Sequence, residues 1–276
     1  MSHYRLIALD IDGTLLNSQK EITPDTAAAI RQAVEAGIAV AFCTGRAVSE
    51  LEDFSALLPE IRYAVFASGG GLYDMRKKEA FSLRGIPRDQ AEAIMAAARP
   101  KDLMPQLVLK DRDVIQASHM ANLERYHMGI YRPLYEKAMT LTEDIFGFFH
   151  ACREDILKIN LYHADPEERI RTREQLAFLP VEMVYSEASS LESSAQGVNK
   201  GTGLMRLCDA LSVPRSASVA VGDAENDIPA LRMAGLGIAM GNANALVKQA
   251  ADRVAADLDH GGCAEAIRAV LRANAE

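Results

Sequence analysis

The sequence predicts an α/β protein in which a separate α+β unit is inserted into a parallel sheet covered by helices on both faces. Near both ends of the chain, short apolar runs alternate with amphipathic helical patterns, which is typical of a doubly covered parallel sheet. In the middle, apolar and polar residues alternate along the expected strands, which favours an antiparallel sheet with one covered face. We therefore expect the two ends to build one sheet and the middle to form an insertion.

The first third of the chain contains three expected strands and a helix. The helix has Thr23 as its N-cap and Pro24 at its first position, and Gly37 ends it. The expected strands are the apolar runs Leu6–Leu9, Ile38–Cys43 and Tyr63–Ala67. This order of strand, helix and strand indicates a parallel sheet.

The middle of the chain differs in its pattern and is expected to be a domain of its own. Gly85 and Pro87 lie in a short segment, Arg84–Arg88, that we interpret as a linker. Helical patterns cover Arg88–Ala98 and Pro166–Phe178, and the alternating strands are Gln106–Leu109, Ile156–Tyr162 and Val181–Tyr185. We expect residues 86–191 to form the inserted domain, and residues 1–85 and 192–276 to form the core domain.

The last third of the chain returns to the pattern of the first. The expected helices are Lys200–Leu211, Glu225–Ala234 and Gly262–Ala273, and the expected strands are Ser218–Val221 and Leu236–Met240. These strands are again short apolar runs, so we expect them to join the sheet of the first third.

Composition and charge exclude several classes of protein. Of the residues, 49% are hydrophobic and 25% are charged, which is the usual balance of a soluble globular protein. The net charge is −8 and no long run of Lys or Arg occurs, so neither nucleic acid nor a membrane is an expected partner. The N-terminus, Met1 to Arg5, lacks the layout of a signal peptide. The four cysteines form no CxxC pair, and together these features predict a cytoplasmic protein.

Polar residues follow three of the expected strands. These stretches are Asp10-Ile11-Asp12-Gly13-Thr14, Thr44-Gly45-Arg46 and Gly222-Asp223-Ala224-Glu225-Asn226-Asp227, and Lys200 opens a helix between the last two. Ligand sites in open α/β sheets lie just beyond the carboxyl ends of the strands, so we expect these residues to meet at one edge. Their convergence is more informative than any one stretch alone.

The residue types at this edge indicate phosphoryl chemistry. Several carboxylates repel one another unless a cation lies among them, and oxygen ligands without His or Cys favour a hard ion such as Mg²⁺. Mg²⁺ and a nearby lysine together neutralise the charge of a phosphoryl group during transfer. One carboxylate can then act as the nucleophile, and a second, two positions further on, can protonate the leaving oxygen and later activate water.

The same four stretches resemble the four motifs of the haloacid dehalogenase (HAD) superfamily. Two further runs, Gly197-Val198-Asn199-Lys200-Gly201 and Ala239-Met240-Gly241-Asn242-Ala243, resemble the Cof-type phosphatases of subfamily IIB. The resemblance implies a Rossmann-like HAD core with a C2-type cap inserted between Thr44 and Lys200. That is where the residue pattern already places the second domain.

The resemblance implies a role for each matched residue in phosphoryl transfer. Asp10 would be the nucleophile and Asp12 the general acid and base. Thr44 would hydrogen-bond the transferring phosphoryl group beside the backbone amide of Gly45. Lys200 would neutralise charge on Asp10 and on the phosphoryl group.

The resemblance also implies a Mg²⁺ site. Asp10, the backbone carbonyl of Asp12 and the side chain of Asp223 would hold the ion, with Asn226 and Asp227 in support. One departure concerns the stretch after the third strand, where the family often has an Asn-Gly pair. This chain has Ser68-Gly69-Gly70-Gly71, so the asparagine amide is missing at Gly69 and the family's contacts to the leaving group are not carried over.

The expected function is that of a Mg²⁺-dependent phosphatase acting on a small phosphorylated metabolite, with a sugar phosphate as the first candidate, as a monomer or small homo-oligomer. A phosphomutase or phosphotransferase is the alternative on the same scaffold. A phospho-accepting signalling domain uses similar residues but is about half as long. Dehalogenation is disfavoured because a departing halide needs no proton, which would leave Asp12 without a task. A binding protein without activity is also disfavoured, because every catalytic position is filled.

Overall fold

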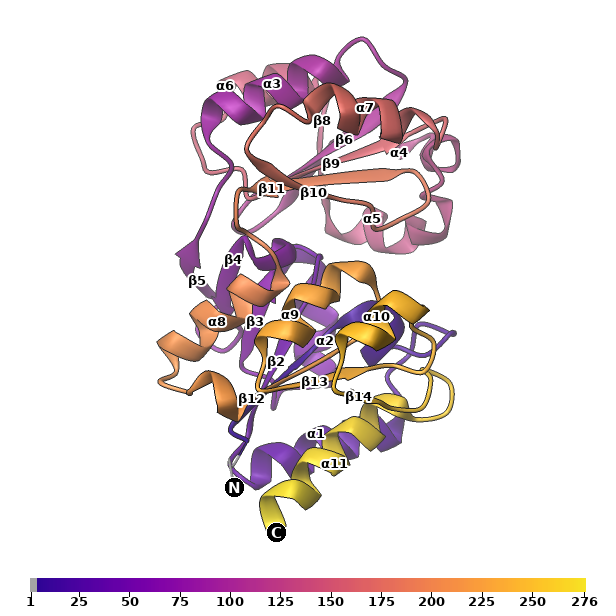
Figure 1. Cartoon of the computed structure of the whole chain (residues 1–276). Coiled ribbons are helices and arrows are strands. Elements are labelled where there is room, and N and C mark those ends of the chain that lie inside the picture. The colour runs from indigo at the N-terminus through magenta and orange to yellow at the C-terminus, as the bar shows by residue number, and fades with distance from the viewer. Residues whose placement is uncertain (1–3) are drawn as a thin grey trace. The chain divides into compact units, whose positions relative to one another are not determined.

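The computed structural model describes residues 4–276, which divide into two compact units (Figure 1). The first unit comprises residues up to Gly45, then Asp53–Phe81 and Asn199–Glu276, and the second comprises Arg46–Glu52 and Ser82–Val198. The expected boundary between residues 191 and 192 falls inside a strand of the second unit, β11 (Ser190–Ala195). The segment Met1 to Arg5 was expected to lack the layout of a signal peptide. Its first three residues, 1–3, lie outside the described residues.

The first unit is built on an eight-stranded sheet in the order β14-β13-β12-β1-β2-β3-β4-β5. The pairs from β14 to β3 are parallel, whereas β3 and β4 are antiparallel. The strands are β1 (Leu6–Leu9), β2 (Ala39–Cys43), β3 (Tyr63–Phe66), β4 (Gly71–Asp74), β5 (Glu79–Leu83), β12 (Ser218–Gly222), β13 (Leu236–Ala239) and β14 (Arg253–Val254). The two ends of the chain therefore build one sheet, as predicted.

Helices cover both faces of this sheet. One face packs its apolar side chains against α8, α9 and α10, and the alternate side chains point to the opposite face, where α1 and α11 pack together (Figure 1). The helices of this part of the chain are α1 (Pro24–Glu35), α2 (Glu52–Leu57), α8 (Lys200–Ala210), α9 (Ile228–Met233), α10 (Ala245–Ala250) and α11 (Gly262–Ala275). Thr23 caps α1 as predicted, since its hydroxyl accepts a hydrogen bond from the backbone amide of Thr26 at 3.2 Å.

The helix expected over Glu225–Ala234 is shorter than predicted. Residues Glu225–Asp227 form a separate short turn, and α9 begins only at Ile228. Pro229 explains the break, because proline lacks an amide hydrogen and is accommodated in the first turn of a helix rather than in its interior.

The second unit contains a six-stranded sheet in the order β10-β11-β9-β6-β7-β8. Its pairs are antiparallel, as the alternating pattern predicted, except that β7 and β8 are parallel. The strands are β6 (Leu103–Val108), β7 (Asp113–Gln116), β8 (Met139–Thr142), β9 (Lys158–His163), β10 (Val181–Val184) and β11 (Ser190–Ala195). Segment Arg46–Glu52 belongs here, and its Ser49 hydroxyl donates to Oδ2 of Asp113 at 3.3 Å.

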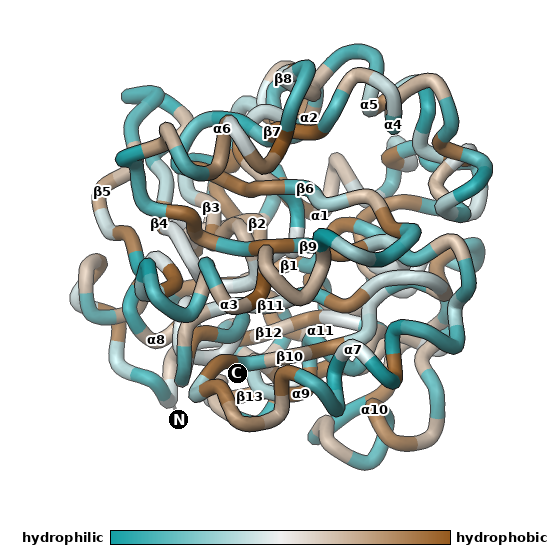
Figure 2. Tube along the Cα trace, turned by 90° about the horizontal axis from the view of Figure 1, so that it is seen from above, coloured by the Kyte–Doolittle hydropathy of each residue, from teal (hydrophilic) through white to brown (hydrophobic). Residues whose placement is uncertain are grey.

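Three helices of the second unit, α3, α6 and α7, pack on one face of its sheet around a continuous apolar cluster. Figure 2 shows hydrophobic residues, in brown, gathered along the strands, while hydrophilic residues, in teal, predominate in many connecting loops. The helices are α3 (Arg88–Ala98), α4 (Ala117–Met120), α5 (Arg132–Ala138), α6 (Ile145–Ala151) and α7 (Glu168–Leu176). The opposite face of the sheet is therefore free of these three helices.

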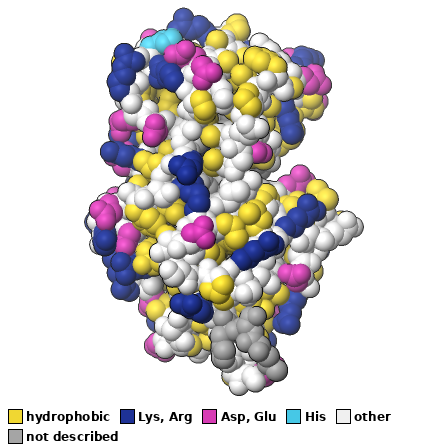
Figure 3. All heavy atoms as spheres, turned by 60° about the vertical axis from the view of Figure 1, so that its left-hand side comes forward, with side chains coloured by type: hydrophobic (Ala, Val, Ile, Leu, Met, Phe, Trp, Pro, Cys, Tyr) yellow, Lys and Arg dark blue, Asp and Glu magenta, His cyan; other side chains and the backbone are white. Residues whose placement is uncertain are grey.

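The surface carries charges of both signs. On the face shown in Figure 3, Lys and Arg side chains are interspersed with Asp and Glu side chains and with hydrophobic patches. Among residues 4–276, no helix combines the length and the apolar character needed to cross a membrane. All four cysteines are free thiols.

Candidate active site

Parallel pairing brings Asp10 and Asp223 to the same edge of the sheet in the first unit. Leu9, the last residue of β1, is paired with Val221 of β12, and the backbone amide of Asp10 donates to the carbonyl of Val221 at 3.0 Å. Asp10 follows β1 directly and Asp223 follows β12 directly, so both leave their strands at neighbouring points. This is the edge at which the sequence predicted a site.

Lys200 joins this edge from the first turn of α8. Asn199 caps the helix, because its side chain accepts from the backbone amide of Thr202 at 3.0 Å. The ammonium group of Lys200 then lies 2.7 Å from Oδ1 of Asp10 and 2.6 Å from Oδ1 of Asp227. The Lys200 side chain is only 1% exposed, so these two ion pairs are shielded from water.

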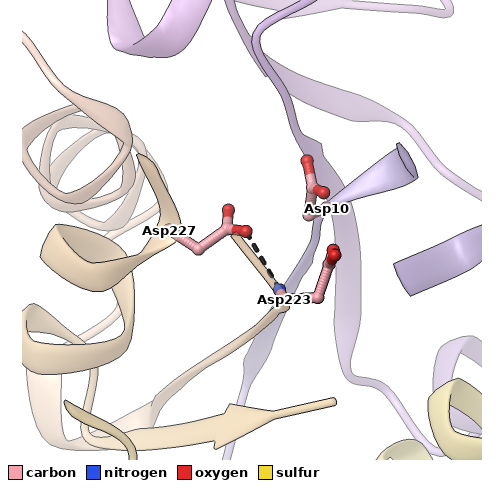
Figure 4. A group of neighbouring side chains, drawn as sticks. All are labelled: Asp10, Asp223 and Asp227. Atoms are coloured by element: carbon pink, nitrogen blue, oxygen red, sulfur yellow. Dashed lines mark hydrogen bonds between the residues drawn. The ribbon is translucent and has the colours of Figure 1, made fainter. Parts of the chain in front are cut away.

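Asp227 is held by the turn that it helps to form. Its Oδ2 accepts hydrogen bonds from the backbone amides of Asp223 and Ala224, both at 3.0 Å, and the bond to Asp223 is the dashed line in Figure 4. Its other oxygen binds Lys200. Asp227 therefore connects the loop after β12 with the lysine of α8, a closer involvement than the supporting role that the resemblance implied.

Three carboxyl groups form a cluster at this edge. Each of Asp10, Asp223 and Asp227 places an oxygen within 4.8 Å of the others, and Figure 4 shows them grouped across the ends of the two strands. Burial raises the pKa of Asp10 well above its usual range, and the charge of Asp227 adds to this, whereas Lys200 opposes it. Burial and then Asp227 raise the pKa of Asp223 to about 6. The cluster thus concentrates negative charge and favours a bound cation.

Lys200 supplies part of the compensation for this charge. Burial by itself lowers the pKa of a lysine, but the carboxylates of Asp10 and Asp227 outweigh it, so the pKa of Lys200 is raised. The side chain is therefore a fixed positive charge beside the carboxylates.

Gly13 allows the loop after β1 to approach Asp223 closely. Its φ of +84° lies in the left-handed region, and a Cβ atom at this position would lie 2.2 Å from Oδ2 of Asp223. The next residue, Thr14, donates from its hydroxyl to Oδ1 of Asp223 at 2.9 Å. The Asp-Gly-Thr sequence therefore orients a carboxylate that comes from a distant part of the chain.

The donor set fits a hard divalent cation. The clustered ligand atoms are all carboxylate oxygens, and Oδ1 of Asn226, in the same loop as Asp223, is buried without a hydrogen-bond partner. An orphaned carbonyl oxygen in the loop that carries Asp223 and Asp227 is suited to a metal or to its water shell. The Asp12 side chain lies outside the cluster, about one third exposed and 3.2 Å from Nζ of Lys20. The metal contact that the resemblance implies for Asp12 is through its backbone carbonyl.

Thr44 follows β2 at the same edge and is 1% exposed. Its amide donates to the carbonyl of Val65 at 2.9 Å, and its own carbonyl accepts from the amide of Ser68 at 3.0 Å. These bonds tie it to the loop after β3, where Ser68 and Gly69 have positive φ values of 55° and 98°. Gly45, the expected partner of Thr44, comes directly after it and is partly buried.

The absence of an asparagine side chain at Gly69 has a steric explanation in this structure. A Cβ atom on Gly69 would lie 2.1 Å from the carbonyl oxygen of Asn199, the residue that caps α8. The carbonyl of Gly69 accepts from the guanidinium of Arg206 at 2.9 Å. A Cβ atom on Gly203 would lie 2.7 Å from the Cα of Gly69. The loop after β3 and the start of α8 are therefore in direct backbone contact.

Sequence reasoning assigned no role to Asn242, which the structure brings to this edge. Its amide nitrogen lies 2.9 Å from the carbonyl oxygen of Gly13 and 3.3 Å from Oδ2 of Asp223. A usable signal was present, because Gly241 and Asn242 follow β13 just as the other polar stretches follow their strands.

Comparison with known proteins identifies relatives along nearly the whole chain. The family model for haloacid dehalogenase-like hydrolases matches residues 7–267. A 5-amino-6-(5-phospho-D-ribitylamino)uracil phosphatase of Bacillus subtilis, YcsE, is 29% identical over 265 residues, covering 96% of this chain and 94% of the relative. A pyridoxal phosphate phosphatase of Escherichia coli, YbhA, is 27% identical over 259 residues, with coverages of 92% and 93%.

A solved structure agrees with the fold. The crystal structure of a haloacid dehalogenase-like hydrolase from Bacteroides thetaiotaomicron superimposes with a TM-score of 0.83 at 28% identity. The match covers 97% of this chain and 99% of the other.

Proposed function

This chain belongs to the haloacid dehalogenase-like hydrolases and is a phosphatase that acts on small phosphorylated metabolites, and we propose that it does so through an aspartyl-phosphate on Asp10. The observation that carries the proposal is the buried ion pair of 2.7 Å between Asp10 and Lys200, beside two further carboxyl groups. A nucleophilic carboxylate, a fixed cation and a cation-binding cluster are the parts that phosphoryl transfer needs.

The first step uses the carboxylate of Asp10. Lys200 binds its Oδ1, so Oδ2 is the oxygen that attacks phosphorus. The new bond joins Asp10 to phosphorus, and the bond from phosphorus to the ester oxygen breaks. Asp12 donates a proton to that departing oxygen, which leaves as an alcohol.

The second step releases phosphate. Asp12, now a carboxylate, takes a proton from a water molecule, whose oxygen attacks the phosphorus of the aspartyl-phosphate. The bond between Asp10 and phosphorus breaks, which regenerates the Asp10 carboxylate and yields inorganic phosphate. Lys200 holds Oδ1 of Asp10 throughout, and Thr44 and Gly45 hydrogen-bond the phosphoryl oxygens.

The carboxylates would hold Mg²⁺. Asp10 and Asp223 would bind the ion with the backbone carbonyl of Asp12, and Asn226 and Asp227 would support it. When bound, the ion neutralises charge on the phosphoryl group during transfer.

The second unit is proposed to select the substrate, and one face of its sheet carries polar side chains suited to this. The Asn160 amide donates to Oε1 of Gln106 at 3.1 Å and to the hydroxyl of Tyr162 at 3.2 Å, while Oδ1 of Asn160 is buried without a partner. The register places Asn160 opposite Gln106 on one side and opposite Glu192 on the other. An acceptor held in this way matches a hydroxyl-bearing leaving group, which supports a sugar phosphate or a related polyol phosphate.

The decisive experiment is a screen of phosphorylated metabolites, measured as release of inorganic phosphate with and without Mg²⁺. We expect release that depends on Mg²⁺ and is greatest for esters of polyhydroxylated alcohols. Asp10→Asn should abolish it by several orders of magnitude, whereas Asp25→Asn, which removes a surface partner of Arg268, should not. Near-normal turnover by Asp10→Asn would refute the aspartyl-phosphate, and transfer of phosphate to a second sugar instead of water would indicate a mutase.

A further inference from the structure

The side chain of Asn242 links three loops at the candidate active site. Its amide nitrogen donates to the carbonyl of Gly13 at 2.9 Å and to Oδ2 of Asp223 at 3.3 Å. Its Oδ1 accepts from the backbone amide of Leu258 at 3.1 Å. One primary amide thus connects the loops after β1 and β12 to the segment before α11.

The three bonds also define which way the amide group faces. The amide of Leu258 can only donate, so it must face the Asn242 oxygen, while the carbonyl of Gly13 can only accept, so it must face the nitrogen. Both hydrogens of the amide are then used, one toward Gly13 and one toward Asp223. Rotating the group would lose all three bonds.

The backbone before Asn242 is equally constrained. Gly241 donates from its amide to the carbonyl of Ala256 at 3.0 Å, and its carbonyl accepts from the ammonium group of Lys248 at 2.6 Å. A Cβ atom at Gly241 would lie 2.6 Å from the backbone nitrogen of Asp257, so only glycine allows this approach. The Asn242 side chain is therefore directed at Asp223 by a fixed main chain.

Asp223 is bonded at both of its carboxylate oxygens. Thr14 donates to Oδ1 at 2.9 Å, and Asn242 donates to Oδ2. Turning the carboxylate about its own axis requires breaking both bonds. Groups that orient a ligand in this way commonly change metal affinity roughly 10–100-fold when removed.

We propose that Asn242 is a positioning residue that holds the Asp223 carboxylate and the Gly13 loop in the orientation needed to bind the metal. The inference rests on the proposed metal-dependent function. It adds to that site a residue from the loop after β13, beside the loops after β1, β2 and β12.

The test is the affinity of the full-length protein for Mg²⁺, measured by calorimetric titration without substrate, together with the melting temperature in a chelator. Asn242→Ala should weaken Mg²⁺ binding roughly 10–100-fold. The matched control is Asn244→Ala, two residues further on, where the side chain caps α10 by accepting from the amide of Val247 at 3.0 Å. The control should lower the melting temperature and leave Mg²⁺ affinity within about twofold of the wild type, because it removes a helix cap and a bond of 3.3 Å to Glu225, and neither contact touches Asp223.

Asn242→Ser is a second variant in case the alanine variant does not fold, since its shorter polar side chain cannot span both Gly13 and Asp223. It should weaken Mg²⁺ binding in the same direction. Wild-type affinity in a folded Asn242 variant would overturn this inference alone. Failure of the wild-type protein to bind Mg²⁺ would instead overturn the proposed metal dependence, and this inference with it.

Discussion

Lys200 and Asp227 form an ion pair with 2.6 Å between Nζ and Oδ1, and neither side chain is more than 4% exposed. The same ammonium group binds Asp10, so one lysine faces two buried carboxylates. Removing one partner of a buried ion pair leaves an uncompensated charge in the interior. The resulting loss of folding free energy is larger than the net stabilisation that the intact pair provides.

We therefore predict that Lys200→Met destabilises the protein as well as inactivating it. The loss should be about 3–5 kcal/mol, because two carboxylates then lie together without their cation. Urea denaturation measures the change. Combining Lys200→Met with Asp227→Asn should recover part of the stability and none of the activity. A single variant as stable as the wild type would show that the carboxylates are not charged in the folded protein.

The general acid is tested at Asp12. Asp12→Asn should slow turnover by roughly 10²–10⁴-fold, the usual contribution of general acid–base catalysis. Phosphorylation of Asp10 should be impaired less for esters with good leaving groups, such as p-nitrophenyl phosphate, because they need less protonation. Rapid-quench measurement of the phosphoenzyme separates this step from hydrolysis. An equal loss for good and poor leaving groups would contradict the assignment.

The raised pKa of Asp223 predicts how pH acts on the metal-free protein. Its pKa is about 6 in the folded state against 3.8 ordinarily, so between these values the folded state binds more protons than the unfolded state. Stability contributed by this group therefore falls as pH rises through that window. Because this contribution to the free energy of unfolding is lost at higher pH, the melting temperature in a chelator should be higher at about pH 5 than at about pH 7.

The same pKa has the opposite effect on metal binding. Mg²⁺ must displace the proton from Asp223, so its affinity should decline as pH falls below about 6. Calorimetric titration at several pH values measures this, and the elevated pKa of Asp10 acts in the same direction. A flat affinity between about pH 5 and about pH 7 would show that neither carboxyl group titrates there.

Selection by the second unit is tested at Asn160. Asn160→Leu removes the buried oxygen and both donors to Gln106 and Tyr162. We expect a rise in KM of roughly tenfold or more for hydroxyl-bearing substrates, because the substrate hydroxyl loses its acceptor, whereas Gln106 and Tyr162 still bond each other at 2.9 Å. Turnover of p-nitrophenyl phosphate should change much less. A parallel loss for both substrates would indicate a general folding defect instead of altered selectivity.

The strands and helices that the sequence predicted well have strong local signals. Thr23, Pro24 and Gly37 mark the ends of α1, and α3 covers Arg88–Ala98 as predicted. Strand β11, Ser190–Ala195, was missed because it is rich in serine and has no apolar run. Its place depends on pairing with β9 and β10, which is a property of the tertiary structure.

The residues of the candidate site likewise divide into those with a local sequence signal and those placed by tertiary contacts. The sequence indicated which carboxylates follow the strands and which lysine opens a helix near them, because strand ends in a parallel sheet lie at one edge. It could not indicate that Asp227 would enter the carboxylate cluster, since that depends on the turn made by the amides of Asp223 and Ala224. Asn242 carries the same signal, since it comes shortly after β13, but its particular bond to the carbonyl of Gly13 depends on the tertiary structure.

The backbone contact between Gly69 and Asn199 restricts the order in which this chain could acquire substitutions. The Cβ of an asparagine at position 69 would lie 2.1 Å from the carbonyl oxygen of Asn199, which is too close for two atoms that are not bonded. That carbonyl belongs to the cap of the helix carrying Lys200, so accepting the new side chain would displace the Lys200 ammonium group from Asp10. A directed-evolution library that varies position 69 alone should therefore return only inactive asparagine variants, and active ones should require accompanying changes at the start of α8.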